Sequence, residues 1–421
     1  MGSFFRAVTA VFFLALSPVI ASAATLSGES KTYLLDREGF DSNRIVPVYE
    51  YLDFSLDGIG SYDVSFHFGG WLSQDLADKS FNKKFDYDLQ YAYLSFRRDT
   101  ANTIVNLGRL MVFEGVAAEH VDGIYAKTDL QHGFAVSGYA GSPVETDFLD
   151  GNGDFIYGAR LSHGIKNLYE FGFSYLRENG DHSFDREEEG VDLWFRPVKE
   201  AQLVGKSSYS TGWQSGWLEH SYNLALGPFS GFTITPIVSW INYETFFSTA
   251  TSAAFKFEPD IIDRDERALI IGADAQYAWN SKLIVAADYK NFGYDVAGSA
   301  NYYGGKLTYK VFESSSVGLG YHRMDGDNER LKYNEYRAWV HDRAGKFDVV
   351  VDGLYVAYDE DINGRDYASS VSGAVGYDFS KEWRVEADAS YSRNPYYDKD
   401  IRGFFKLIYK FNITPQAKKG V

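Results

Sequence analysis

The chain has 421 residues, no cysteine and a formal charge of −17. The lack of cysteine excludes disulfides, a lipid-bearing N-terminal cysteine and covalently attached haem, whose C-x-x-C-H motif requires thiols. The acidic balance disfavours nucleic-acid binding, because phosphates repel carboxylates. Aromatic residues make up 17% of the chain, yet mean hydropathy is −0.29. This combination is typical of a sheet that is apolar on one face and polar on the other.

The N-terminus is predicted to be a secretory signal peptide, residues 1–23. Arg6 precedes an apolar run over residues 7–20, and the Ala-Ser-Ala of residues 21–23 has the small-residue pattern of a cleavage site. The run is too short to span a membrane as a helix. No other long apolar run follows, so we expect no spanning helix in the mature chain, which is expected to begin near Ala24 or Thr25.

Strand periodicity is clearest over residues 371–391. Apolar or small side chains occupy the odd positions of residues 371–379, and small or polar ones the even positions. After a short break, Trp383 restarts the pattern, which continues to Tyr391. Successive strand side chains point to opposite faces, so this stretch is predicted to be a hairpin with one apolar and one polar side.

Similar segments of roughly 9–14 residues recur along the chain. We count about 22 of them, with a range of roughly 18 to 22. The first is weak, so residues 24–45 are either an N-terminal arm or a first strand. Short breaks, such as residues 98–102 and 197–200, alternate with longer polar connections, such as residues 73–86, 244–267, 359–367 and 393–400. Outer-membrane barrels have short periplasmic turns and longer external loops.

The predicted fold class is therefore all-β: a transmembrane, antiparallel, up-and-down β-barrel over residues 46–412, with a short periplasmic tail at residues 413–421. A secreted soluble β protein is the alternative.

The last strand adds a second signal. Its apolar face alternates with lysines at positions 406 and 410, and that face comprises Phe405, Leu407, Tyr409 and Phe411. This pattern resembles the C-terminal recognition strand of bacterial outer-membrane proteins, although ten residues follow Phe411. With the strand alternation, the turn parity and the step at residues 107–109 (Leu-Gly-Arg), the mature chain resembles a bacterial outer-membrane porin.

The resemblance implies a water-filled channel in the outer membrane of a Gram-negative bacterium. It implies passive diffusion of small hydrophilic solutes or ions, with no cofactor, and a monomeric or homo-oligomeric assembly surrounded by outer-membrane lipid. The barrel-assembly machinery is expected to read the strand that ends near Phe411. Where part of the acidic excess lines the pore, it favours a mild preference for cations; a set of acidic external loops is the alternative interpretation of the same charge.

The polar strand faces supply the candidate selectivity residues. They are Asp63, His67, Asp192, Arg196, Asp274, Asp288, Lys290, Lys306, Glu335, Arg337, Arg384, Glu386 and Asp388. Two interpretations stay open: these charges set the field that permeating ions meet, or neighbouring strands pair them into salt bridges that only rigidify the wall.

Two connections are candidates for a constriction. Residues 244–267 form the longest loop, and its aromatic residues are Phe246, Phe247, Phe255 and Phe257. Exposing so apolar a loop to water is costly, so it is expected to fold into the mouth or lumen. A subunit contact or an external partner site is the competing use. Residues 113–120 are also expected to dip inward, bringing Glu114, Glu119 and His120 near the channel.

Metal and enzyme signals are weak. Residues 359–364 match the first half of a calcium loop, but the twelfth position is Ser370, so an Asn-Gly hairpin explains them better. There is no G-x-S-x-G turn and no H-E-x-x-H motif. His220 and Ser221 are adjacent in sequence, which places them on opposite faces of a strand. We therefore predict no enzyme activity and no metal.

One functional alternative remains. About 22 strands enclose a lumen wide enough to need a plug or a guest. In this alternative, the guest is a multihaem cytochrome, and the barrel is the insulating sheath around it in an electron conduit across the outer membrane.

Overall fold

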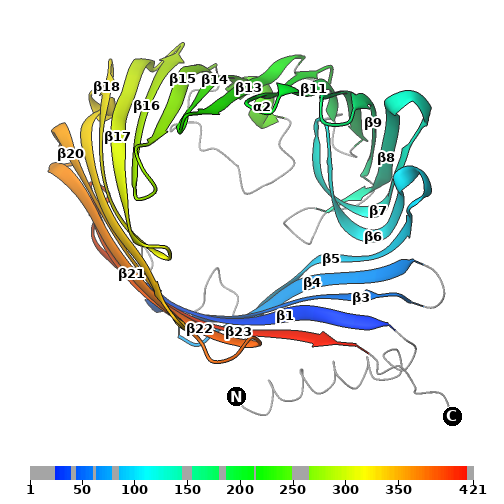
Figure 1. Cartoon of the computed structure of the whole chain (residues 1–421), viewed down its shortest axis with the longest axis horizontal. Helices are drawn as coiled ribbons and strands as arrows, with labels where there is room; N and C mark the ends of the chain where they lie inside the picture. The colour runs from blue at the N-terminus through cyan, green and yellow to red at the C-terminus, as the bar shows by residue number, and fades with distance from the viewer. Residues whose placement is uncertain are drawn as a thin grey trace.

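The computed structural model describes residues 24–38, 44–59, 63–77, 85–144, 154–179, 186–212, 215–248 and 265–414. They form one antiparallel sheet that closes on itself as a barrel (Figure 1). The predicted signal peptide at residues 1–23 and residues 415–421 of the predicted tail lie outside the described residues. Within the described part of the chain, no helix is long and apolar enough to cross a membrane.

The barrel closes between the two ends of the chain. β1 (Thr25–Glu38) pairs with β23 (Tyr397–Ile413) on one side and with β3 (Pro47–Asp57) on the other. The segment that the sequence left as an arm or a strand is therefore a barrel strand. The two-residue β2 (Arg44–Ile45) pairs with the end of β1 next to β3. The result is a closed barrel of 22 strands, as predicted.

The other strands follow each other in up-and-down order. They are β4 (Val64–Asp75), β5 (Phe85–Arg98), β6 (Thr103–Glu114), β7 (Ala117–Asp129), β8 (Phe134–Pro143), β9 (Phe155–Ile165), β10 (Tyr169–Asn179), β11 (Arg186–Val198), β12 (Ala201–Ser210), β13 (Gly216–Phe229), β14 (Phe232–Asn242), β15 (Arg267–Ala278), β16 (Leu283–Tyr294), β17 (Gly298–Phe312), β18 (Ser315–Gly326), β19 (Lys332–Ala344), β20 (Phe347–Ile362), β21 (Arg365–Asp378) and β22 (Trp383–Asn394). Helix α2 (Tyr243–Ser248) follows β14, and short 3-10 turns are η1 (Thr100–Asn102), η2 (Gln131–Gly133) and η4 (Glu329–Leu331).

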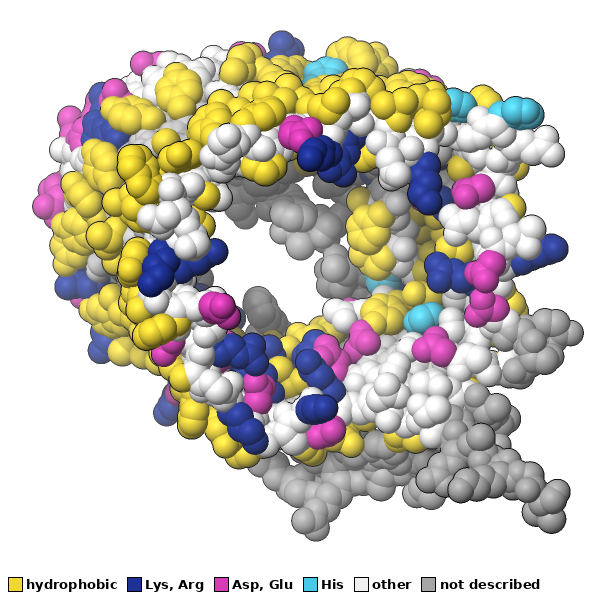
Figure 2. All heavy atoms as spheres, viewed as in Figure 1, with side chains coloured by type: hydrophobic (Ala, Val, Ile, Leu, Met, Phe, Trp, Pro, Cys, Tyr) yellow, Lys and Arg dark blue, Asp and Glu magenta, His cyan; other side chains and the backbone are white. Residues whose placement is uncertain are grey.

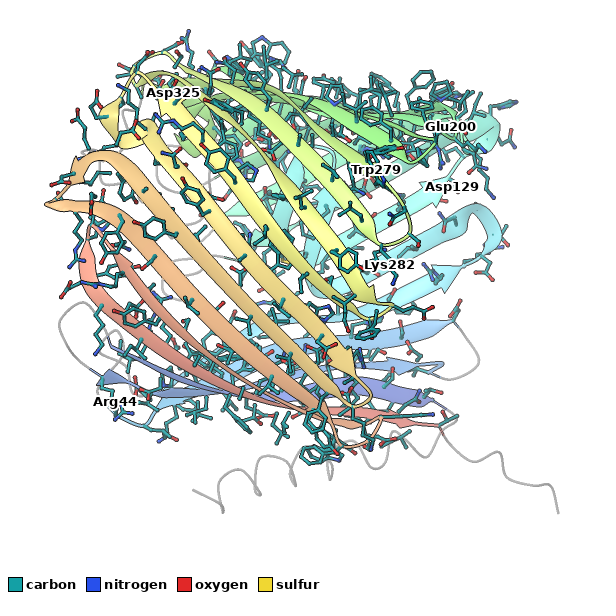
Figure 3. The ribbon with its side chains drawn as sticks, turned by 60° about the vertical axis from the view of Figure 1, so that its left-hand side comes forward. Arg44, Asp129, Glu200, Trp279, Lys282 and Asp325 are labelled. Atoms are coloured by element: carbon teal, nitrogen blue, oxygen red, sulfur yellow. The ribbon has the colours of Figure 1, made fainter. Side chains whose placement is uncertain are left out.

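Consecutive connections lie at alternate ends of the barrel. Figure 3 shows the turn residues Asp129, Glu200, Trp279 and Lys282 toward one end and Arg44 and Asp325 toward the other.

The predicted long loops at residues 359–367 and 393–400 are wrong, because the strands continue through them. β20 and β21 meet at a two-residue turn in which Asn363 and Gly364 have φ of 51° and 78°. Such left-handed positions favour Asn-Gly in a tight hairpin, so the half calcium loop is a turn.

The two faces of the sheet differ in chemistry. On β22, Arg384 contacts Glu386 at 2.6 Å and Asp378 of β21 at 3.1 Å. On the opposite face, Trp383 stacks on Tyr409 of β23 with ring centroids 4.4 Å apart. We call the face that carries Arg384, and the positions in register with it, the lumen face. Large apolar side chains remain exposed on the other face, such as Leu319 at 63%. This inverts the soluble plan and suits a bilayer.

One hairpin departs from the regular wall. Pairing between β5 and β6 stops at Ala92 and Arg109, and the rest of β6 and β7 separates from β5. Arg109 closes this seam, donating to both carboxylate oxygens of Asp122 at 2.7 Å and to the Leu89 carbonyl at 3.1 Å. Figure 1 shows β6 and β7 on the inner side of β8 and β9. We call residues 109–122 the inner hairpin.

A row of glycines permits this bend. Gly108, Gly123 and Gly141 lie directly opposite one another on β6, β7 and β8. A Cβ added to Gly123 would overlap the Ala140 carbonyl oxygen and come within 2.7 Å of the Gly141 Cα. Glycine inside a strand weakens it but allows backbones to approach closely. The row therefore marks where the sheet curls into the barrel.

Candidate functional site: the barrel lumen

Most predicted selectivity residues share the lumen face. In the strand register these are His67, Asp192, Asp274, Asp288, Lys290, Lys306, Glu335, Arg337, Arg384, Glu386 and Asp388. The two others lie at strand ends. Asp63 precedes β4 in a turn, where its carbonyl accepts from the Arg97 amide at 2.9 Å. Arg196 lies near the end of β11 and donates to the Lys199 carbonyl at 3.1 Å.

Many charges on the wall are paired across strands. Lys406 lies 3.1 Å from Glu386, and Arg337 lies 2.9 Å from Asp352.

A histidine that the sequence analysis missed joins this wall: His322 of β18 contacts Asp288 at 2.9 Å, while Tyr302 stacks on its ring at 5.0 Å. His322 lies directly opposite Glu335 of β19, and this placement on the lumen face could be predicted only with the strand register in hand.

The Asp388 carboxylate differs from its neighbours. No ion pair or hydrogen bond reaches it among the described residues, although Glu386 two positions away is paired twice. An unpaired lumen carboxylate is free to interact with a permeating cation. Among the described residues, no group of three His, Cys, Asp or Glu side chains is arranged to hold a metal ion.

The inner hairpin covers a small hydrophobic core on the lumen face. Leu110, Val112 and Val121 of the hairpin pack with Ile156 of β9 and Leu176 of β10, and all five are at most 2% exposed. Burial of each such side chain stabilises the fold by about 2 kcal/mol. At the hairpin tip, the Val116 amide donates to Ser174 Oγ at 3.0 Å. The hairpin is thereby fixed against the inside of the wall.

Two arginines border this core. Arg186 of β11 lies 2.9 Å from Glu119, bonds Glu188 and lies 3.7 Å from Glu178. Its side chain is 15% exposed, and those of Glu119 and Glu188 are 5% and 6% exposed. The charges are thus largely desolvated, and Arg186 contributes to the compensation of all three carboxylates.

Arg160 of β9 forms the second cluster. It contacts Asp192 at 2.6 Å, Glu170 at 2.8 Å and Glu114 at 3.9 Å. Glu114 also accepts from Tyr125 at 2.5 Å. The predicted inward course of residues 113–120 is confirmed: Glu114 and Glu119 reach the lumen wall from the hairpin. His120 alternates with Glu119 along β7, so it lies on the opposite face of the hairpin.

The predicted constriction loop is only partly described. Helix α2 packs against the start of β13, where the Thr245 hydroxyl donates a hydrogen bond to the Trp217 carbonyl at 2.8 Å. Phe246 belongs to this helix. The side chain of Phe247 and residues 249–264, which include Phe255 and Phe257, lie outside the described residues.

A serine–histidine contact on the outer face was also missed. Ser207 Oγ of β12 lies 2.8 Å from His220 Nδ1 of β13 and 2.6 Å from the Tyr222 hydroxyl. Trp217 and Trp240 flank the histidine at centroid distances of 4.6 and 5.4 Å. Sequence reasoning considered only the adjacent Ser221. The pairing depends on the hairpin register, which a bulge beyond Ser208 disturbs.

No known protein family matches the sequence, and no curated protein matches it. Solved structures share its fold. The siderophore receptor PirA from Pseudomonas aeruginosa aligns with a TM-score of 0.57 at 12% identity, over 92% of this chain and 80% of that chain. A mutant form of the ferric enterobactin receptor PfeA from the same organism gives 0.58 at 8%, over 93% and 80%. PirA from Acinetobacter baumannii gives 0.57 at 10%, over 93% and 81%. At these identities the likeness concerns the fold, and it confirms the prediction of an outer-membrane type of β-barrel.

Proposed function

We propose that this chain is a diffusion channel in the outer membrane of a Gram-negative bacterium, passing small hydrophilic solutes or ions with a mild preference for cations. The observation that carries the proposal is the open, charged lumen: Figure 2 shows an opening through the molecule bordered by Lys, Arg, Asp and Glu side chains. An apolar outer face and a polar inner face are what a pore in a bilayer requires.

The lumen residues supply selectivity through charge and width. Paired charges such as Arg384 and Glu386 give the wall a field of both signs, and Asp388 adds an uncompensated carboxylate. The inner hairpin occupies part of a lumen that 22 strands would otherwise leave wide. We propose that residues 244–267 narrow it further. No cofactor takes part. Assembly through β23 by the barrel-assembly machinery and a homo-oligomeric state belong to the same proposal.

Planar-bilayer recording tests the proposal. We expect the purified protein to give stepwise conductance and, in a KCl gradient, a reversal potential of the sign for cation preference. Asp388→Asn should lower the cation-to-anion permeability ratio by about twofold, because it removes an unpaired lumen carboxylate. Asp99→Asn, in the short turn between β5 and β6, is the control and should leave the ratio unchanged, because this carboxylate lies outside the strands of the wall. A silent protein would contradict the channel.

The sheath around a multihaem cytochrome is the second candidate. It is favoured by the small side chains on the lumen face of β21 and β22: Ala368, Ser370 and Ser390 line a recess of about 350 Å³, whose rim also includes the larger Leu354, Tyr397 and Arg402. A recess of this kind can receive a side chain of a guest protein. Haem absorbance in barrels purified from native membranes, together with absent conductance, would favour the sheath over the channel.

We also propose that the barrel catalyses no reaction. Ser207 is buried at 6% exposure and is bonded to Tyr222 as well as His220. Among the described contacts, no carboxylate or amide orients the second nitrogen of His220, so a triad is lacking. We expect equal background hydrolysis of a fluorogenic phospholipid by the wild type and by Ser207→Ala in detergent micelles. Activity that disappears in Ser207→Ala would show the barrel to be a lipid hydrolase.

A further inference from the structure

Aromatic rings line one part of the lumen face, between β23 and β4. Tyr33 of β1 lies between Phe404 of β23 and Tyr51 of β3, with centroid distances of 5.3 and 5.0 Å. Trp71 of β4 follows at 6.4 Å from Tyr51, and Tyr49 lies 5.7 Å from Trp71. We call these five residues the aromatic track. It crosses three strand spacings, roughly 14 Å.

The register places the track inside the barrel. Lys406, Tyr33, Tyr49 and Ser73 lie opposite one another across four strands, and Lys406 belongs to the face of Glu386. The three tyrosines and Trp71 are half-buried, so part of each ring faces the lumen. Aromatic carbon exposed to water in a channel is unfavourable unless a ligand covers it.

The polar side chains beside the track include positively and negatively charged groups. Lys406 lies 5.5 Å above the Tyr33 ring and 3.1 Å from Glu386. A small cavity of about 100 Å³ adjoins the track, and its polar lining comprises Glu29, Lys31, Asp53 and Gln90. Glu29 and Lys31 are paired with each other.

The tyrosine hydroxyls add donors to this set. Among the described contacts, the hydroxyls of Tyr33, Tyr49 and Tyr51 have no hydrogen-bond partner. Half-exposed rings with free polar edges are characteristic of binding surfaces, because the ring covers an apolar face while the hydroxyl bonds a polar group.

We infer that the aromatic track binds a neutral carbohydrate, a short oligosaccharide passing through the lumen. Pyranose rings present apolar C–H faces to aromatic rings and hydroxyls to donors and acceptors around them. Beside the track the charges occur as ion pairs, Glu29 with Lys31 and Lys406 with Glu386. A free ion would be attracted by one member of each pair and repelled by the other, whereas a neutral polyol can form hydrogen bonds with both. The inference rests on the proposed channel function and names the solute class that this wall selects.

Block of the KCl current tests the inference, with maltohexaose as the probe. We expect millimolar maltohexaose to block wild-type current reversibly. Trp71→Ala and Tyr51→Ala should each lower the association constant about tenfold, as expected for the loss of one stacking ring. Trp339→Ala removes a lumen-face tryptophan outside the track and should change nothing. Heat-modified mobility in gels verifies that each variant is folded.

The outcomes separate the two proposals. Normal conductance without block, or equal block in Trp71→Ala, overturns the carbohydrate inference and leaves the channel standing. Block by adenosine but not by maltohexaose overturns the solute class. A protein without any conductance overturns the channel; quenching of tryptophan fluorescence by maltohexaose in detergent, absent in Trp71→Ala, would then support the track alone, and no quenching would overturn it too.

Discussion

Replacing Arg186 by methionine is expected to lower the free energy of unfolding by about 3 kcal/mol or more. The guanidinium is the shared partner of Glu119, Glu178 and Glu188, and its side chain is only 15% exposed. Without it, three carboxylates face one another in a site from which water is largely excluded. Urea titration of the folded barrel in detergent, followed by tryptophan fluorescence, measures the loss.

The control is an arginine that forms the same kind of ion pair at a solvent-exposed position. Arg337 is 52% exposed, and within the described part of the chain its one ion-pair partner is Asp352. Arg337→Met should therefore cost less than about 1 kcal/mol. Adding Glu119→Gln to Arg186→Met should restore part of the lost stability, because it removes one of the three carboxylate charges that repel one another there. If Arg186→Met and Arg337→Met lose the same amount, the cluster around the inner hairpin contributes no more than an ordinary surface pair.

The architecture could be predicted because a barrel in lipid separates two environments at every strand. Strand side chains alternate between the two faces with a period of two. The sequence of residues 371–391 therefore indicates which face meets water, even when the neighbouring strands are unknown. The alternation of short and long connections then gives the direction of each strand, and an even strand number follows. Both signals are local, which is why the fold class and an approximate strand count were within reach of one sequence. Closure through β1 was not, because that strand is recognised only by its pairing with β23 and β3.

The inner hairpin was predicted only as an inward dip, since its contacts depend on strands far away in the chain. One local signal was present: residues 110–113, Leu-Met-Val-Phe, are apolar on both faces. Such a stretch departs from the alternation of apolar and polar side chains that the other wall strands follow. Leu110 and Val112 face the core, whereas Met111 and Phe113 remain 49% and 71% exposed on the other side.

Pairing partners were beyond the sequence for a different reason. Which charge meets Arg160, or which serine meets His220, depends on register across strands and on the bend of the sheet. A slip of one residue reverses every face. The row of Gly108, Gly123 and Gly141 is likewise visible only when three strands are aligned, because glycines occur throughout this chain, 40 in all.

That row leads to the second large effect. Gly123→Ala is expected to destabilise the barrel by about 2–3 kcal/mol, because the new methyl group meets backbone atoms that cannot rotate away. These are the Ala140 carbonyl and the Gly141 Cα. To relieve the overlap, β7 must move away from β8, and the inner hairpin then loses its fit against β9 and β10. Single-channel recording should show a larger or noisier conductance as the hairpin leaves the lumen wall.

Gly373→Ala provides the matched control for this substitution. Gly373 also lies inside a strand, but the nearest atom to its added Cβ is the Val350 carbonyl oxygen at 4.0 Å. A methyl group fits there, so the change in unfolding free energy should stay within about 0.5 kcal/mol and the conductance should be unchanged. Equal behaviour of the two variants would mean that the curl tolerates a side chain at Gly123. The glycine row would then not be what turns β6 and β7 into the barrel.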